Sequence, residues 1–174
     1  MIAATAAAAF VQLRHLSSSN SISALTESRE VLESAEFAAA QRVVAFELPE
    51  LLKDPAVRQR LNISPVDEQL RPIVVVGNFF ESLGSFIRHG IIDKEVAVSL
   101  WSDVVLRNWE NLGPALAIMR RVSGPVLWDQ FEYLARVSQE WIDAHEQGDY
   151  PTGVAHLPLK DVWLEADQPK TSPS

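Results

Sequence analysis

The 174-residue sequence contains no cysteine and has few basic residues. The absence of cysteine excludes a disulfide framework, a zinc site built from thiolates and a cysteine nucleophile. Fifteen Lys and Arg stand against 23 Asp and Glu, which gives a formal net charge of −8. Nucleic-acid binding draws much of its affinity from counterions released at Lys and Arg. The composition therefore provides no basic surface for a nucleic-acid partner.

Long uncharged runs are also missing, and the longest is Met1–Leu13. As a helix this run would extend only about 20 Å, whereas the hydrocarbon core of a bilayer is about 30 Å thick. The run also lacks the basic start of a secretory signal. Three interpretations stay open. The run could be an Ala-rich helix that packs or frays, or a helix at the membrane surface, which is disfavoured because only Arg14 and His15 could form its basic face. It could also be the end of a transmembrane helix whose upstream half is absent, with Arg14 at the cytoplasmic border.

The residues that are present are typical of one compact domain, with 47% hydrophobic and 22% charged residues. Apolar residues recur every three or four positions, and no convincing alternation of the kind found in strands occurs. We therefore predict an all-α, compact bundle of five to seven helices joined by short Gly/Pro turns. Its expected divisions are an apolar helix over 1–20, the helical domain over 21–151, and an irregular to disordered tail over 152–174.

Several helix boundaries are marked by capping residues. Ser34, Asp54 and Asp93 are expected as N-caps, with Pro55 in the first turn after Asp54. Pro49 is expected to end or kink the helix before it. The helix that follows Ser34 should bury an apolar stripe formed by Phe37, Ala40, Val44 and Leu48.

The centre of the core is predicted to be a long helix over 68–89, closed by Gly90 at the C′ position. The next helix should run from Asp93 to about Asn111, because Gly113-Pro114 interrupts the pattern, and a short helix should follow. The last long helix is expected to start at Gly124-Pro125.

Known reaction signatures are missing from the sequence. It has no glycine-rich phosphate loop and no G-x-S-x-G elbow. None of the four histidines has a carboxylate or another histidine three or four residues before it, which removes the common zinc and di-iron helix motifs. We therefore assign no catalytic residue, cofactor or metal ligand, and lean against an enzyme.

The most informative polar residues lie on the central helix. They share one face at spacings of four, three and four: Gly77, Glu81, Gly84 and Arg88. In a functional interpretation Glu81 would act as a base or bind a cation in the groove between the glycines. In a structural interpretation, which we favour, Glu81 accepts hydrogen bonds or forms an ion pair, with Arg88, Arg107 or Asn108 as donors.

These considerations define a candidate polar cluster of Asn78, Glu81, Arg88 and Arg107, either structural or ligand-binding. A ligand pocket at this place would be lined by Glu81, Arg88, Arg107 and Trp109. An enclosed pocket at Glu81 would support the ligand-binding interpretation.

The chain resembles a family of small bacterial proteins known only as a domain of unknown function. The residues that carry the resemblance are Gln12-Leu13-Arg14, Phe37-x-x-Ala40-Gln41-Arg42, Asp54-Pro55, Asn78-Phe79-Phe80-Glu81-x-Leu83-Gly84, Arg88-His89-Gly90-Ile91-Ile92-Asp93, Trp109, and Leu127-Trp128-x-x-Phe131-Glu132-Tyr133-Leu134. The resemblance implies an N-terminal transmembrane helix followed by a helical domain. It implies no activity, cofactor or catalytic residue.

We therefore expect a non-enzymatic helical module that contacts an unknown protein partner and is tethered to the cytoplasmic side of the bacterial inner membrane. One alternative is a soluble cytoplasmic enzyme or ligand sensor with its pocket at Glu81. Another is a soluble homodimer that buries the Ala-rich helix against its copy.

Overall fold

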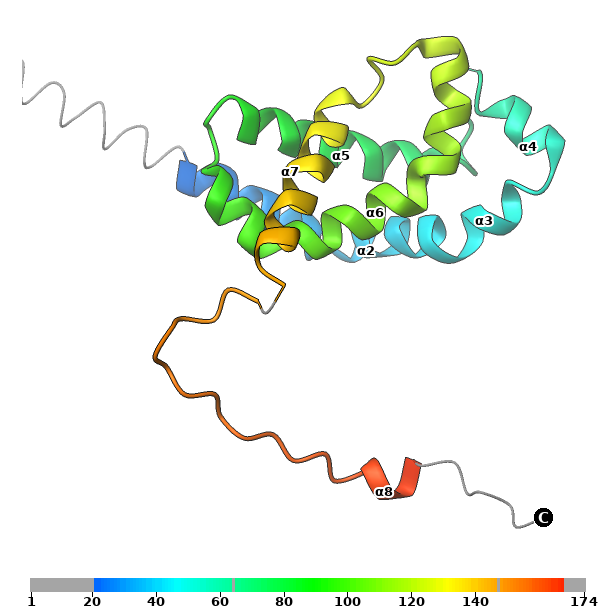
Figure 1. The fold of residues 1–174 in the computed structure, drawn as a ribbon. Helices are drawn as coiled ribbons and strands as arrows, with labels where there is room; N and C mark the ends of the chain where they lie inside the picture. Colours follow the sequence, from blue (N-terminus) through cyan, green and yellow to red (C-terminus); the bar gives the residue numbers. More distant parts are fainter. Residues whose placement is uncertain (1–20, 64, 147, 168–174) are drawn as a thin grey trace, which may run out of the picture.

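The computed structural model describes residues 21–63, 65–146 and 148–167, and the regular structure in these ranges is helical (Figure 1). Residues 21–32 form a helix. The later elements are α2 (Ala35–Arg42), the π-helix η1 (Val43–Glu47), α3 (Leu48–Leu51), α4 (Pro55–Arg60), α5 (Arg71–Arg88), α6 (Lys94–Ser123), α7 (Asp129–Ala144) and α8 (Leu164–Asp167). The predicted all-α bundle is confirmed.

The three predicted N-caps are also confirmed. The Ser34 hydroxyl accepts a hydrogen bond from the Phe37 N–H at 3.1 Å. The Asp54 carboxylate accepts from the Ala56 N–H at 2.8 Å, and the Asp93 carboxylate accepts from the Val96 N–H at 3.0 Å. Each cap satisfies a backbone donor that has no partner inside its own helix.

Pro49 does not end the first long helical stretch. Its apolar stripe is buried as predicted, from Phe37 to Leu48, and the helical path continues through η1 into α3. In η1 the Leu48 N–H bonds to the Val43 carbonyl, five residues back. Pro49 then stands in the first turn of α3, a position at which helices tolerate proline.

The core is built around α5, which packs against α2, α6 and α7. Its fully buried side chains include Ile73, Val76, Phe80 and Leu83. The helix starts at Arg71 rather than at the predicted 68, and Gly90 follows its end with φ +67°, as a C′ glycine does.

The predicted break in α6 is wrong. A single helix runs from Lys94 to Ser123 with Pro114 inside it, and it bends sharply in its second half (Figure 1). Leu112, Ala115 and Leu116 around the proline are buried, so packing favours the helical path on both sides. A proline inside a helix removes one backbone hydrogen bond and bends the helix without necessarily ending it.

The start of the last long helix was also predicted wrongly. Residues 125–128 form a turn, and α7 begins at Asp129. Trp128 stands in the N-cap position with φ 55° and ψ 44°, the left-handed region that bulky residues rarely adopt. The Gly124-Pro125 pair therefore belongs to the turn and not to the helix.

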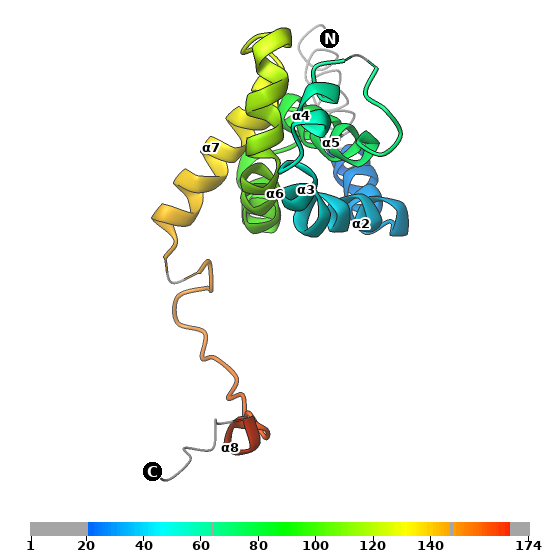
Figure 2. The same cartoon turned by 90° about the vertical axis from the view of Figure 1, so that its right-hand side faces the viewer.

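After α7 the chain leaves the helical domain and runs as an extended segment to α8 (Figure 2). The described side chains from Pro151 to Leu164 are exposed. The predicted Ala-rich helix over 1–20 lies outside the described residues. In the described ranges no helix is both long and apolar enough to cross a membrane.

Candidate functional site

The glycine face of α5 receives the turn that leads into α7. A Cβ atom placed on Gly77 would overlap the indole ring of Trp128, and one on Gly84 would overlap the carbonyl oxygen of Gln130. Trp128 is only 3% exposed. The two glycines therefore form a slot, as the sequence suggested, and the slot is filled by the chain itself.

Polar groups beside the slot fix the same segment. The Trp128 indole N–H donates to the Asn78 side-chain oxygen at 3.0 Å. The Arg88 guanidinium donates to the Gln130 side-chain oxygen at 3.1 Å. Asn78 and Arg88 thus hold the start of α7 at two points along α5.

Glu81 caps α7 from the neighbouring helix. Its carboxylate accepts a hydrogen bond from the Phe131 N–H at 2.9 Å, across 50 residues of sequence. Trp128, at the N-cap position of α7, provides no side-chain cap. The first N–H groups of a helix need a hydrogen-bond acceptor, and a negative charge near them is stabilising. Glu81 therefore acts as the capping group that α7 lacks at its own N-cap position. In the structural interpretation Glu81 accepts a hydrogen bond, and it does so here. The donor is a backbone N–H group.

This position perturbs the Glu81 carboxyl group. Burial raises its pKa above the ordinary value, while the hydrogen bond from the Phe131 N–H acts in the opposite direction. The nearby carboxylate of Asp129 raises the pKa further. The balance leaves a raised pKa, because loss of solvation outweighs the donated hydrogen bonds.

Arg120 holds the turn from the side of α6. Its guanidinium donates to the carbonyl oxygen of Leu127 at 3.0 Å, and it forms an ion pair with Glu132 at 2.7 Å. The unusual backbone of Trp128 is therefore fixed from two helices, which is the condition under which a strained conformation persists.

Arg107, the fourth member of the predicted cluster, lies elsewhere. It is exposed and lines a hollow with Arg42, Asn108 and Asn111. Asn78, Glu81 and Arg88 come together, and each bonds to a residue between 128 and 131. Since Trp128 and Gln130 occupy the space between the glycines, this part of α5 works as an internal docking surface.

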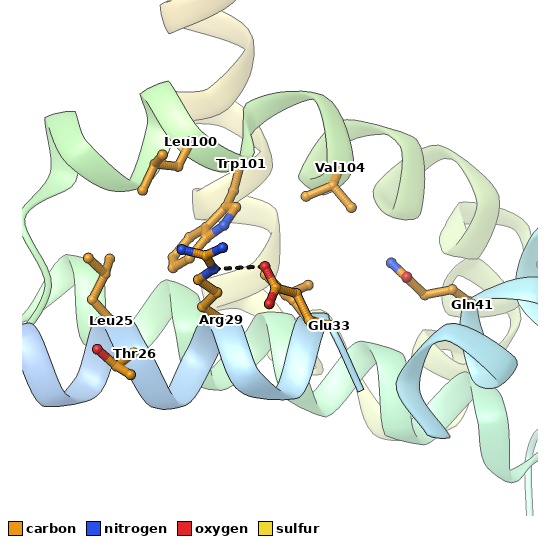
Figure 3. Close-up of a pocket in the computed structure, with 9 residues that line it drawn as sticks. Leu25, Thr26, Arg29, Glu33, Gln41, Leu100, Trp101 and Val104 are labelled. Atoms are coloured by element: carbon orange, nitrogen blue, oxygen red, sulfur yellow. Dashed lines mark hydrogen bonds and ion pairs between the residues drawn. The ribbon is translucent and has the colours of Figure 1, made fainter. Parts of the chain in front are cut away.

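A different hollow is open to solvent. It lies between residues 21–32, α2 and the first half of α6, and has a volume of about 520 Å³ (Figure 3). We call it the α6 groove, and it is lined by Leu25, Thr26, Arg29, Leu32, Glu33, Gln41, Leu100, Trp101 and Val104. Figure 3 shows Leu100, Trp101 and Val104 on one wall, with Leu25 and the Arg29–Glu33 ion pair on the other.

A second hollow of about 260 Å³ adjoins the α6 groove, since Gln41 and Val104 line both spaces. We call this second space the arginine end, because Arg42 and Arg107 line it together with Phe46, which is 75% exposed. Neither arginine takes part in an ion pair with another described residue. An apolar groove thus ends in positive charge.

The α6 groove is not predictable from the sequence pattern, because its apolar residues look like core residues. On α6, Ala97, Val98 and Val105 are buried, whereas Val96 and Leu100 are 43% and 58% exposed. One feature of the sequence could have indicated the groove. The helix α6 carries more large apolar residues than one helix face can bury. No group of three or more His, Asp or Glu side chains in the described residues could hold a metal ion.

The close approach at Gly84 predicts a strong effect of a single methyl group. We expect Gly84→Ala to lower the free energy of unfolding by about 1–3 kcal/mol, because the backbone carbonyl of Gln130 cannot yield easily. Gly113→Ala is the control, since a Cβ there would meet no atom within 4 Å apart from its chain neighbours. It should change stability by less than about 1 kcal/mol, because the helix propensity that Ala adds is opposed by the clash of its Cβ with the ring of Pro114. Urea denaturation measures both, and an equal response would refute the docking of α7 at Gly84.

The raised pKa of Glu81 predicts a pH dependence. The folded protein favours the protonated carboxyl, so this contribution to stability is fully present below the unfolded pKa of about 4.3. It is lost as pH rises through the higher folded pKa. Glu81→Gln keeps an acceptor oxygen and removes the charge, so its stability relative to wild type should increase between about pH 4 and pH 7.

Glu81→Ala separates the cap from the charge. It leaves the Phe131 N–H without its acceptor and should cost about 1 kcal/mol more than Glu81→Gln. Thermal unfolding at several pH values measures both variants. Identical curves for the Gln and Ala variants would show that Glu81 does not cap α7.

Residues 2–141 match the family described as a domain of unknown function (DUF4760). The match contains α2 to α6 and most of α7, and it ends before the extended tail. Comparisons with curated proteins and with solved structures gave no match. The resemblance to a domain of unknown function is confirmed, and the chain belongs to this family.

Proposed function

We propose that this chain is a protein-interaction module and that the α6 groove is its binding surface. The observation that carries the proposal is the apolar lining of the groove, half-buried except for the exposed Leu100, beside two exposed arginines. Exposed apolar surface next to polar groups is typical of sites that bind another protein. The slot between the glycines of α5 offers no opening, because the turn before α7 fills it. A hollow of about 460 Å³ adjoins it and is lined in part by Asn78 and Trp128.

The shape of the groove favours a side-chain-bearing segment over a small ligand. Small-molecule pockets enclose most of the ligand surface, whereas Leu100 on one wall of this groove is 58% exposed. The walls are two helices with apolar residues facing each other (Figure 3). Such a surface receives the apolar face of a short helix or turn, with anchors spaced three or four residues apart.

The charges of the groove favour an acidic partner segment. At the arginine end, Arg42 and Arg107 are both exposed and share one hollow. Oppositely charged groups on the partner would accelerate encounter and set the orientation of binding. The preferred partner therefore has large apolar residues followed by Asp or Glu.

A second part of the proposal concerns location. We propose that the segment before residue 21 tethers the module to the cytoplasmic side of the bacterial inner membrane. The support is the uncharged run Met1–Leu13, followed by Arg14. Because residues 25–33 form one wall of the groove, such a tether would hold the binding surface close to the membrane.

A photo-crosslinking residue at Leu100 in the full chain tests the binding surface. Leu100 is exposed and lines the groove, so we expect a discrete adduct with one protein in the native host. The same residue at Val126, which is 71% exposed and lies in the turn before α7, is the control. Adducts that are equally abundant and diverse at both positions would refute the proposal.

Fractionation of natively expressed protein tests the tether. The chain as given is compared with one extended upstream to any earlier in-frame start. We expect the extended form to sediment with membranes and to resist salt and carbonate. Recovery of both forms in the soluble fraction would reject the tether and leave the groove proposal standing.

A further inference from the structure

The extended segment after α7 carries a dense set of exposed apolar residues. They lie within eight positions and are 57–98% exposed: Leu157, Leu159, Val162, Trp163 and Leu164. We call residues 157–167 the tail motif. Large apolar side chains in water are unfavourable when they lie together, and such a concentration marks a surface that another surface covers.

The tail motif has local order and more acidic than basic residues, since Asp161, Glu165 and Asp167 stand against Lys160. The Asp161 carboxylate accepts a hydrogen bond from the Trp163 N–H at 2.9 Å, and α8 begins at the next residue. Asp161 and Asp167 are exposed. An Asp before a short helix organises the turn that presents Val162, Trp163 and Leu164 together.

These features match the α6 groove. The apolar residues of the tail motif correspond to the walls formed by Leu25, Leu100 and Val104. The acidic residues correspond to Arg42 and Arg107 at the arginine end. The chain thus carries both an apolar groove that ends in positive charge and an apolar segment that ends in negative charge.

We propose that the tail motif of one copy binds in the α6 groove of a second copy. This inference rests on the proposed function, since it assigns an occupant to the same groove. The tail leaves the end of α7 and extends away from its own helical domain in both views (Figures 1 and 2). This direction presents it to another molecule.

Each copy has one tail and one groove, and the proposed exchange is reciprocal. Two such contacts related by a two-fold axis close the assembly at a dimer. An acidic amphipathic segment of another protein would compete for the same groove. A partner would therefore have to bind the groove more tightly than the tail motif does in order to displace it.

Analytical ultracentrifugation of the full chain over a concentration series tests the proposal. Wild type should form a dimer, and Trp163→Asp should weaken dimerisation about tenfold or more. Because Trp163 is 68% exposed, the substitution leaves the core intact. Val154→Asp, at a residue of the same segment that is 55% exposed, is the control and should dimerise like wild type.

The groove side is tested with Leu100→Asp, which should weaken dimerisation to a similar extent, and with Val126→Asp as its control. A mixture of Trp163→Asp and Leu100→Asp provides the decisive measurement. The first variant has an intact groove and the second an intact tail, so one contact re-forms between them. The mixed dimer should therefore be tighter than either variant alone.

The outcomes separate this inference from the proposed function. A wild-type chain that stays monomeric, including one whose tail binds its own groove, overturns the exchange. A dimer that survives Trp163→Asp overturns it as well. An adduct from Leu100 to a different protein would then still support the groove as a binding surface, whereas an adduct to residues 157–167 of a second copy supports the exchange.

Discussion

The docking of Trp128 onto α5 is the interaction on which the arrangement of the domain depends. It places a large indole ring against a helix at a glycine, where no Cβ keeps the two apart. It also requires a left-handed backbone at a bulky residue. The conformation persists because Asn78, Arg120 and the buried contacts of the ring fix it together.

Once Trp128 is placed, the direction of α7 follows. Glu81 then lies at the first turn of α7 and accepts a hydrogen bond from the Phe131 N–H. The ring of Phe131 stacks on Phe80 in the core, with ring centroids 4.9 Å apart. The polar and apolar contacts thus act on neighbouring residues of one segment. The position of the Glu81 carboxylate, for which the sequence left a structural and a functional interpretation open, is explained by the need of a helix start for an acceptor.

The α6 groove and the tail motif share a physical origin. Both place large apolar side chains outside the buried core of the domain. Leu100 belongs to a regular helix and Leu159 to an extended segment, yet both remain in water. Close-packed interiors accept no further side chains without strain, so surplus apolar residues are left for contacts between molecules.

Local signals in the sequence predicted much of the fold. Ser34, Asp54 and Asp93 marked helix starts, because a cap depends only on residues within one turn. Phe37, Val44 and Leu48 marked a buried stripe, because helical periodicity needs no knowledge of the neighbour. The shared face of Gly77, Glu81 and Gly84 was likewise readable from their spacing.

Only the tertiary structure decided what those residues contact. The sequence predicted that Pro114 breaks its helix, yet packing around Leu112 and Leu116 keeps α6 continuous. It grouped Arg107 with Glu81, although Arg107 faces the arginine end. The partner of Glu81 lies 50 residues away. Periodicity and capping specify which residues share a face, but the neighbour of that face depends on how the helices cross, which no local pattern contains.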